Sequence, residues 1–379
     1  MSIYEEEHNV FREAFQQFIA EEITPNLDEW EQAHLVPKSV YLKMGENGFL
    51  CPWLPEEYGG SETDFIFSAI MTEELARAGA VTVMAGLHSD IIAPYLYHIG
   101  TDEQKSKWLP RCASGETILA IAATEPNAGS DVAGFQTKAE LDGDEYVLNG
   151  SKTFISFGQI ADLFVVIART DKEGPPHKGL SLFLVEADTP GFSRGNKLDK
   201  MGMHGQDTSE LFFDDCRIPA SNLLGEPGKG FYYFMHHLQQ ERLICSLMAQ
   251  GMAEAMLEMT IEYTRDRKVG GVPVQSFQAN AFTIAEMATE IELGRTFLDT
   301  LTAAHARGED VSTKVTMAKS WIPEMTNKVA YRCLQLHGGY GYMEEYPICR
   351  FTRDARVISI FAGTTEVMKH ILAKGMGLY

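Results

Sequence analysis

The period of the hydrophobic pattern changes twice along this chain, and the two changes limit the folds that it can adopt. Residues 1–117 carry helical patterns, in which aromatic residues such as Phe11 and Phe15 recur on one helix face. Residues 118–228 instead form short apolar runs between Gly, Pro and Asp turns, which is the pattern of strands. Long helical patterns return over residues 229–379. The sequence therefore predicts an α+β chain with a helical N-terminal domain, a central β domain and a helical C-terminal domain, bounded at these residues.

Three local signals refine this outline. Thr101, followed three residues later by Gln104, is typical of the start of a helix. Pro25 is expected to end the first helix, because a proline inside a helix removes a hydrogen bond. In "YVLNGSKTFIS" the pair Asn149-Gly150 predicts the turn of a β-hairpin, since both residues tolerate a positive φ.

Composition excludes some classes of function. Apolar and aromatic residues make up 45% of the 379 positions, which is enough for a large core in two or three domains. The formal charge of −21 argues against nucleic-acid binding, because phosphate contacts need clustered Lys and Arg. We interpret the acidic surface as a source of solubility, with the steering of a basic partner as the alternative.

The chain carries no signal of a membrane or secretory protein. No apolar run approaches the roughly 20 residues that a membrane-spanning helix needs. The N-terminal segment is acidic and helix-patterned, unlike a signal peptide or an Arg-rich transit peptide. The six cysteines form neither a CxxC pair nor a Cys/His metal spacing, so we expect reduced, structural thiols and no metal. We expect a cytoplasmic bacterial protein, or a protein of the mitochondrial matrix if a transit peptide has been removed.

One carboxylate lies inside the apolar stripe of a long predicted helix. In "GFYYFMHHLQQERLICSLMAQGMAEAMLEMTIEY", Glu241 falls in the middle of the arc formed by Phe234, Leu238, Cys245, Met248, Met252, Met256 and Met259. A buried carboxylate is costly unless it is paired or protonated. It is explained either by an ion pair or local exit to water, or by a general base whose pKa an apolar pocket raises. Its neighbour Arg242 points about 100° away around the helix and need not neutralise it.

Three further segments have the character of ligand-binding loops. "IAATEPNAGSDV" (121–132) runs from a strand into a turn where Thr124 and Ser130 supply donors, although surface turns of this kind are common. "LQLHGGYGYMEEYP" (334–347) places two glycines directly after a helix, where the backbone can approach a ligand closely. This segment matches no phosphate-loop or dinucleotide fingerprint. "RVISIFAGTTEVMKH" (356–370) leads into a helix start, which suits an anion or a carbonyl oxygen that gains negative charge.

Six segments, taken together and in this order, resemble the flavin-dependent acyl-CoA dehydrogenases. They are "CPWLPEEYGG", "TEPNAGSD", "LNGSKTFIS", "KMGMHGQDTSELFFDDCRIP", "QLHGGYGYMEEYP" and "RDARVISIFAGTTEV". The resemblance implies a helical N-terminal domain, a central β-barrel or sandwich and a C-terminal four-helix bundle. It also implies non-covalent FAD in the crevice between the domains and a homotetramer built as a dimer of dimers. The implied acceptor of the electrons is electron-transfer flavoprotein.

The resemblance also gives a meaning to Ala362, which can neither accept nor donate a proton from its side chain. Many members of the family carry the catalytic glutamate at this position, whereas the isovaleryl-CoA and long-chain enzymes carry it on the long helix. "LQQERL" (238–243) matches that subset, so the resemblance assigns the base to Glu241. The N–H of Ala362 would still hold the thioester oxygen. Glu241 would remove the α-proton of an acyl-CoA while the β-hydrogen leaves as hydride to flavin N5, giving a trans-2-enoyl-CoA.

The remaining site residues are expectations from the same resemblance. Flavin contacts are expected from the β domain and the C-terminal domain, at Ile121, Ala122, Ala123, Thr124, Gly129, Ser130, Phe154, Ile155, Ser156, Gln335, Leu336, His337, Gly338, Gly339, Thr364, Thr365 and Glu366. Arg267 and Gln278 are expected to reach the FAD of a neighbouring subunit. Contacts with the CoA thioester are expected from Ser130, Tyr232, Gln239, Arg242, Ala362 and Gly363.

Two departures from the family pattern concern the affinity for the cofactor. The segment Arg267-Lys268-Val269-Gly270-Gly271 lacks an aromatic residue that the family has beside the cofactor. Phe154 stands where a tryptophan is common near the flavin. Neither change removes a charge or a catalytic group, so the expected activity stays the same.

The expected substrate is a long-chain or branched acyl-CoA, because a base on the helix leaves space beside Ala362. We interpret Asp90, in "LHSDI" (87–91), as a solvated loop acid. The alternative places Asp90 beside the acyl chain, where it would suit an alicyclic acyl-CoA of the cyclohexane- or cyclohexene-carbonyl type. The rival functions are a flavin oxidase or monooxygenase on the same scaffold and a flavin-binding assembly protein without catalysis.

Overall fold

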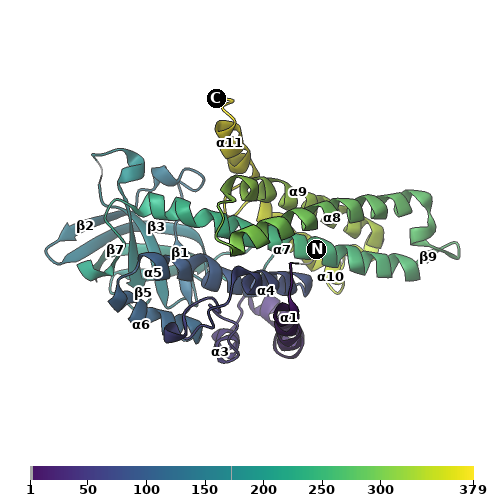
Figure 1. The fold of residues 1–379 in the computed structure, drawn as a ribbon, viewed down its shortest axis with the longest axis horizontal. Coiled ribbons are helices and arrows are strands. Elements are labelled where there is room, and N and C mark those ends of the chain that lie inside the picture. Colours follow the sequence, from purple (N-terminus) through teal and green to yellow (C-terminus); the bar gives the residue numbers. More distant parts are fainter. Residues whose placement is uncertain (1–2, 172) are drawn as a thin grey trace.

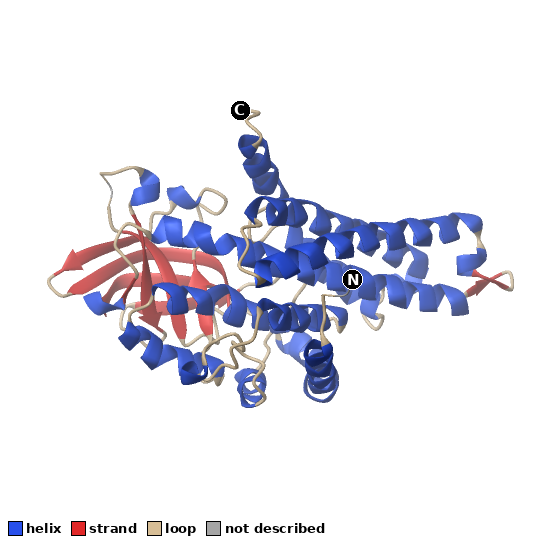
Figure 2. Ribbon diagram, in the orientation of Figure 1, coloured by secondary structure: helices blue, strands red, loops and turns tan. Residues whose placement is uncertain are grey.

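The computed structural model describes residues 3–171 and 173–379. The strands of the main sheet gather at one end of the molecule, and the long C-terminal helices extend away from them (Figures 1 and 2). The N-terminal region is helical and comprises α1 (Glu6–Phe18), α2 (Leu27–Ala33), α3 (Lys38–Glu46), α4 (Phe65–Arg77), α5 (Ala93–Ile99) and α6 (Asp102–Ala113). The order of helices, strands and helices confirms the predicted fold class.

The ends of the N-terminal helices follow local chemistry. Helix α6 begins as predicted, because the Thr101 hydroxyl accepts the Gln104 N–H at 3.2 Å and the Gln104 side chain accepts the Thr101 N–H at 3.0 Å. The prediction that Pro25 ends the first helix is wrong. Helix α1 ends at Phe18 and a π-helical turn follows; Pro25 lies in the first turn of the next short 3₁₀ helix, where its missing N–H has no cost.

The central region is one eight-stranded sheet. Its strands are β1 (Leu119–Ala122), β2 (Lys138–Asp142), β3 (Glu145–Ser156), β4 (Leu163–Arg169), β5 (Leu180–Glu186), β6 (Phe192–Lys197), β7 (Thr208–Pro219) and β8 (Leu223–Leu224). The order is β6-β7-β3-β2-β4-β5-β8, with β1 parallel to β4. Because β2 and β4 share only the pair Lys138 and Arg169, the sheet consists of two parts joined at this one pair: β6, β7, β3 and β2 are antiparallel, and β4, β5 and β8 are antiparallel with β1 added parallel to β4.

The hairpin predicted at Asn149-Gly150 is wrong. Both residues lie inside the continuous strand β3, and the turn between β2 and β3 is instead at Gly143 and Asp144. Gly150 is required by close packing, since a Cβ there would lie 2.6 Å from the hydroxyl of Thr137. A shift in the pairing of β3 with β7 also occurs at this point, so the Asn-Gly pair forms an irregularity within a strand rather than a turn.

The C-terminal region is built on three long helices that run side by side (Figure 1). The long helices are α7 (Gly230–Asp266), α8 (Gln278–Ala306) and α9 (Ser312–His337), and the shorter helices α10 (Pro347–Ala355) and α11 (Thr365–Gly375) follow them. The short strands β9 (Lys268–Val269) and β10 (Val272–Pro273) join α7 to α8. Most of the predicted apolar stripe of α7 is buried, as expected, including Leu238, Cys245, Met248, Met252 and Met256. None of the helices described is long and apolar enough to cross a membrane.

Buried ion pairs connect the N-terminal helices to the C-terminal bundle. Glu73 of α4 is 2% exposed and pairs with Arg295 of α8. Arg295 also pairs with Glu254 of α7, at 2.8 Å between Nη2 and Oε1. Arg12 of α1 pairs with Glu74 at 2.8 Å. Burial raises the pKa of Glu73 and the charge of Arg295 lowers it, so the ionised form of this acid depends on its partner.

Replacing Arg295 by leucine is expected to lower the free energy of unfolding by about 3–5 kcal/mol, because it leaves a buried carboxylate unpaired. The matched control is Arg307→Leu, since Arg307 and its partner Glu309 are both exposed and such a pair contributes about 0–1 kcal/mol. Urea denaturation followed by circular dichroism measures both variants. Equal losses in the two variants would contradict the role of the buried network.

Candidate active site

The predicted site residues fall into two groups near opposite ends of α7. Glu241 lies in the fourth turn of this helix. Lys319, whose charge influences the Glu241 carboxylate, is bonded to the turn that contains Ala362. Arg267 follows the last residue of α7. Glu241 and Arg267 are 26 positions apart, and at 1.5 Å per helical residue they are separated by ~39 Å.

Glu241 has the environment of a proton acceptor. Its side chain is only partly buried, yet the surrounding protein raises its pKa to about 7, with burial as the main cause. The positive charges of Arg242 and Lys319 act in the opposite direction. Arg242 does not close an ion pair over the carboxylate but donates Nη1 to the hydroxyl of Thr316 at 3.0 Å. The ion-pair explanation is therefore not supported by Arg242, and the raised pKa suits a base that works near neutral pH.

A buried lysine holds the turn that contains Ala362. Lys319 of α9 donates its ammonium hydrogens to the carbonyl oxygens of Ile358, Phe361 and Gly363, at 2.7, 3.0 and 3.1 Å. Ala362 has a φ of 53°, a left-handed conformation that costs a residue with a Cβ about 1–3 kcal/mol. Lys319 was not found from the sequence, because a lysine in a helical pattern is usually exposed.

A second buried lysine organises the loop that follows β1. Lys152 of β3 is fully buried and donates to Glu125 Oε1 at 2.7 Å and to the carbonyl of Ala123 at 3.0 Å. Glu125 in turn accepts the N–H groups of Gln136 and Thr137, at 2.6 and 2.9 Å. The pKa of Glu125 is lowered because its charge is stabilised by Lys152 and these N–H groups, although burial alone would raise it. These contacts fix the first part of the 121–132 segment to β3 and to the residues just before β2.

The flavin contacts expected from the β domain are brought together by this loop. The N–H of Thr153 donates to the carbonyl of Thr124 at 2.9 Å, which places the end of β1 beside β3. Phe154 is 67% exposed with a φ of 58°, so its aromatic ring lies at the surface on a strained backbone. A strained, exposed aromatic residue is typical of a ligand-binding position. Gly129 and Ser130 are also exposed.

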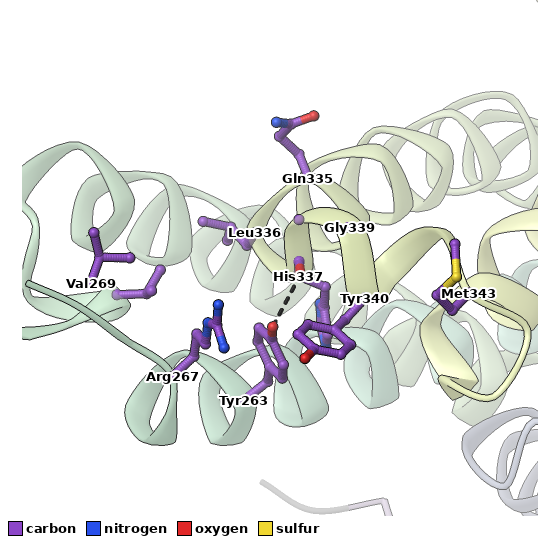
Figure 3. A pocket seen from close by; sticks show the side chains of 11 residues that line it. Tyr263, Arg267, Val269, Gln335, Leu336, His337, Gly339, Tyr340 and Met343 are labelled. Carbon is purple, nitrogen blue, oxygen red and sulfur yellow. Dashed lines mark hydrogen bonds between the residues drawn. The ribbon is translucent and has the colours of Figure 1, made fainter.

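A cavity at the far end of α7 gathers most of the other residues that are expected to contact the cofactor (Figure 3). It has a volume of about 510 Å³ and is lined by Tyr263, Arg267, Val269, Val274, Gln335, Leu336, His337, Gly338, Gly339, Tyr340 and Met343. Its wall is rigid, because the rings of Tyr263 and His337 stack at 4.3 Å and the Tyr263 hydroxyl donates to the His337 carbonyl at 3.1 Å. The guanidinium of Arg267 faces the ring of Tyr340 at 5.5 Å. Gln278, at the first residue of α8, is not among the lining residues.

The residues expected to contact CoA lie on three elements. Tyr232, on the first turn of α7, is 44% exposed. The side chain of Gln239 contacts the α8–α9 connection: Nε2 lies 2.9 Å from His305 Nδ1, and Oε1 accepts from the Ser312 hydroxyl at 2.8 Å. These contacts give Gln239 a structural role, and its contact with CoA stays a prediction. The α11 residues expected to touch the flavin begin at Thr364, whose hydroxyl caps the helix by accepting the Val367 N–H at 3.2 Å.

The interpretation of Asp90 as a solvated loop acid is wrong. Asp90 is 1% exposed and lies in a π-helical turn, Leu87–Ile92, which contacts both α4 and α7. Ser68 donates to its Oδ1 at 2.6 Å, and Gln240 donates to its backbone carbonyl at 2.6 Å. Burial raises its pKa to about 7. Ser68 and Gln240 also line a cavity of about 130 Å³, with Trp53, Phe65, Pro94 and His98.

Replacing Lys152 by methionine is expected to weaken flavin binding at least tenfold, the equivalent of about 1.4 kcal/mol. The variant leaves Glu125 without its cation, so the segment that carries Thr124 loses its support. The content of bound flavin after gel filtration measures the effect. Lys138→Met, an exposed change on the adjacent strand β2, is the control. Normal flavin content in Lys152→Met would show that the ion pair does not support the site.

Comparison with known proteins gives consistent matches along the whole chain. Family models for acyl-CoA dehydrogenase match in three pieces, the N-terminal domain over residues 5–116, the middle domain over residues 120–216 and the C-terminal domain over residues 228–377. The long-chain specific acyl-CoA dehydrogenase of mitochondria from Rattus norvegicus is 45% identical over 373 residues, which cover 98% of this chain and 87% of that protein.

Solved structures agree with these matches. A crystal structure of an acyl-CoA dehydrogenase from Geobacillus kaustophilus has a TM-score of 0.98 and 53% identity, covering 99% of this chain and 100% of that chain. A structure described as the electron transferring flavoprotein of Acidaminococcus fermentans, concerned with flavin-based electron bifurcation, has a TM-score of 0.94 and 36% identity and covers 99% of both chains. The chain described above thus belongs to the acyl-CoA dehydrogenase family of flavin-dependent oxidoreductases.

Proposed function

We propose that this protein is an FAD-dependent acyl-CoA dehydrogenase in which Glu241 removes the α-proton of the substrate. The observation that carries the proposal is the placement of Glu241. It is a partly buried acid on α7, and its pKa is raised to about 7. Helix α9 packs against α7 and is bonded through Lys319 to the turn that contains Ala362. A carboxylate with this pKa is ionised in an appreciable fraction of molecules at neutral pH and is more basic than a solvated one.

The residues present fit FAD. Gly338 has a φ of 61°, and a Cβ at Gly338 or Gly339 would meet no atom within 4 Å, so the backbone of this segment is open to a ligand. Arg267 supplies a guanidinium suited to a diphosphate, because its planar fork can bind two oxygens. The exposed ring of Phe154 supplies a face for an aromatic ring system. Bound FAD would supply the acceptor for the β-hydride at flavin N5.

The chain itself would act on the α-carbon and on the thioester oxygen. Ala362 would donate its N–H to that oxygen and stabilise the negative charge that grows there as Glu241 takes the proton; loss of one such donor costs about a hundredfold to a thousandfold in rate. Because Glu241 is only partly buried, an acyl chain that covers its exposed side would exclude water and raise its basicity.

The proposed substrate is a long-chain or branched acyl-CoA. The absence of a carboxylate side chain at Ala362 leaves space beside the thioester, and the similarity to the long-chain enzyme of Rattus norvegicus supports this assignment. The buried Asp90, whose partners Ser68 and Gln240 line the cavity beside α4, favours an alicyclic acyl-CoA as the second candidate. A screen of acyl-CoA thioesters for loss of the yellow flavin colour distinguishes the two classes, and oxygen consumption would reveal an oxidase or monooxygenase.

The proposed partners are electron-transfer flavoprotein and further copies of this chain. The similarity to the chain described with the electron transferring flavoprotein of Acidaminococcus fermentans supports the first. The second follows from the ~39 Å between Glu241 and Arg267, because one FAD molecule cannot reach both residues of one subunit. We propose a homotetramer, built as a dimer of dimers, in which Arg267 and the 335–339 segment bind the FAD of a neighbour. A cytoplasmic location, or the mitochondrial matrix, fits this partner.

Replacing Glu241 by glutamine is expected to keep bound FAD and acyl-CoA binding but to slow flavin reduction by at least about a thousandfold. The amide keeps the shape of the side chain and cannot accept the proton. Stopped-flow absorbance of the flavin after addition of acyl-CoA measures the rate. Glu258→Gln, on the exposed side of the same helix, is the control.

The pH dependence gives a second measurement on the same residue. Because the base must be ionised, the rate of flavin reduction should rise with pH through about 7 and reach a plateau above it. Near-normal bleaching in Glu241→Gln, or a rate that falls over this range in the unmodified protein, would place the base elsewhere.

Replacing Arg267 by alanine is expected to release FAD while the subunit keeps its fold, because the guanidinium faces an open cavity and not the core. Arg265→Ala, in the exposed last turn of α7, is the matched control. Analytical ultracentrifugation with detection of flavin absorbance measures assembly and cofactor together. A monomer that retains FAD as tightly as the assembled protein would contradict the cross-subunit site.

A further inference from the structure

Lys319 is buried in the bundle, and its protein contacts satisfy its ammonium group completely. The residue is 0% exposed and has three donor hydrogens, which match its three carbonyl acceptors at Ile358, Phe361 and Gly363. Ile358 lies in the 3₁₀ helix Arg356–Ser359, and Phe361 and Gly363 lie in the turn between this helix and α11. The lysine therefore anchors a single short segment of backbone from inside the protein.

These bonds also fix the direction of the Ala362 N–H. In a trans peptide the carbonyl oxygen of Phe361 and the N–H of Ala362 point in opposite directions. Because the Phe361 oxygen points toward Lys319, the Ala362 N–H must point away from it. In the part of the chain that the structure describes, this N–H donates to no acceptor. Lys319 thus holds an unused donor facing outward, in a left-handed conformation that an alanine would otherwise avoid.

The same ammonium acts on Glu241 through space. The charged and titratable groups that influence or are influenced by this carboxylate are Arg242 and Cys245 on α7, Tyr95 on α5 and Lys319 on α9. Arg242 and Lys319 are its positive neighbours. Arg242 is tied to Thr316, whereas Lys319 is tied to the turn of Ala362. Lys319 therefore fixes the position of the Ala362 N–H and also influences the pKa of Glu241.

We propose that Lys319 is a positioning residue of the active site, whose ammonium aims the Ala362 N–H at the thioester oxygen. This inference rests on the proposed function, because it takes Glu241 as the base and the Ala362 N–H as the oxygen-binding donor. Because Lys319 is buried and its three hydrogens are already donated to carbonyls, it would touch neither substrate nor cofactor.

The test compares flavin reduction in the FAD-loaded protein and in Lys319→Met, with palmitoyl-CoA and isovaleryl-CoA as probes. The methionine has a similar length and no charge, so the variant should reduce its flavin about a hundredfold more slowly, with a smaller change in acyl-CoA affinity. Its pH profile should also move to higher pH, because a positive neighbour has been removed from the carboxylate. A residue that served only to stabilise the bundle would leave this midpoint unchanged.

Two further variants make the outcome decisive. Lys319→Arg keeps the charge but replaces three converging donors by a planar fork, so it should keep the pH midpoint and lose about tenfold in rate. Thr326→Val removes a buried hydrogen bond from the same helix to the carbonyl of Ala249, and should leave rate and midpoint unchanged. If Lys319→Met does not fold, a normal rate in Lys319→Arg overturns the positioning role. If it folds, a normal rate and midpoint overturn the proposal.

The failure of the proposed function would look different. If neither probe nor any other acyl-CoA bleaches the flavin of the unmodified protein, the assignment of the reaction is wrong. If the unmodified protein is bleached and Lys319→Met behaves identically, only the role of Lys319 is wrong.

Discussion

Helix α7 runs without interruption from Gly230 to Asp266, and at 1.5 Å per residue it is a rod of ~55 Å. Glu241 lies near one end of this rod and Arg267 follows the other, so the helix fixes the distance between them. The β domain contacts the first part of α7, and the cavity around Arg267 lies at the last part. The separation of the two groups of site residues follows from this single geometric constraint.

Buried lysines stabilise the loops on both sides of the proposed crevice. Lys152 fixes the segment after β1 through Glu125, and Lys319 fixes the turn before α11 through three carbonyls. In each case the ammonium satisfies polar groups that a loop would otherwise bury without partners. Each lysine also lies near a residue with a positive φ, Phe154 in one case and Ala362 in the other. At both places, hydrogen bonds from a buried lysine therefore hold a segment close to a residue with strained backbone.

Much of the fold and the place of Glu241 in a largely buried stripe were accessible from the sequence, because they depend on periodicity, whereas its role as the base rests on the family resemblance and stays a prediction. The change from helical to strand patterns and the position of Glu241 within an apolar stripe are properties of neighbouring residues. The predicted turn at Asn149-Gly150 is wrong because the glycine is required there by close packing against Thr137 on another segment, and not by a turn. Asp90 was misjudged because α4 and α7 cover it, and Lys319 was missed because its acceptors lie about 40 positions further along the chain. Such contacts leave no local pattern.

The rod-like geometry of α7 has a genetic consequence in the proposed assembly. A complete site would take Glu241 from one subunit and Arg267 from its neighbour, so defects in these two residues affect different halves of a shared site. When a subunit lacking a functional Glu241 pairs with one lacking a functional Arg267, one of the two sites combines both defects and the other contains neither. Two inactive alleles expressed together would therefore restore part of the activity, a case of intragenic complementation arising from the length of one helix.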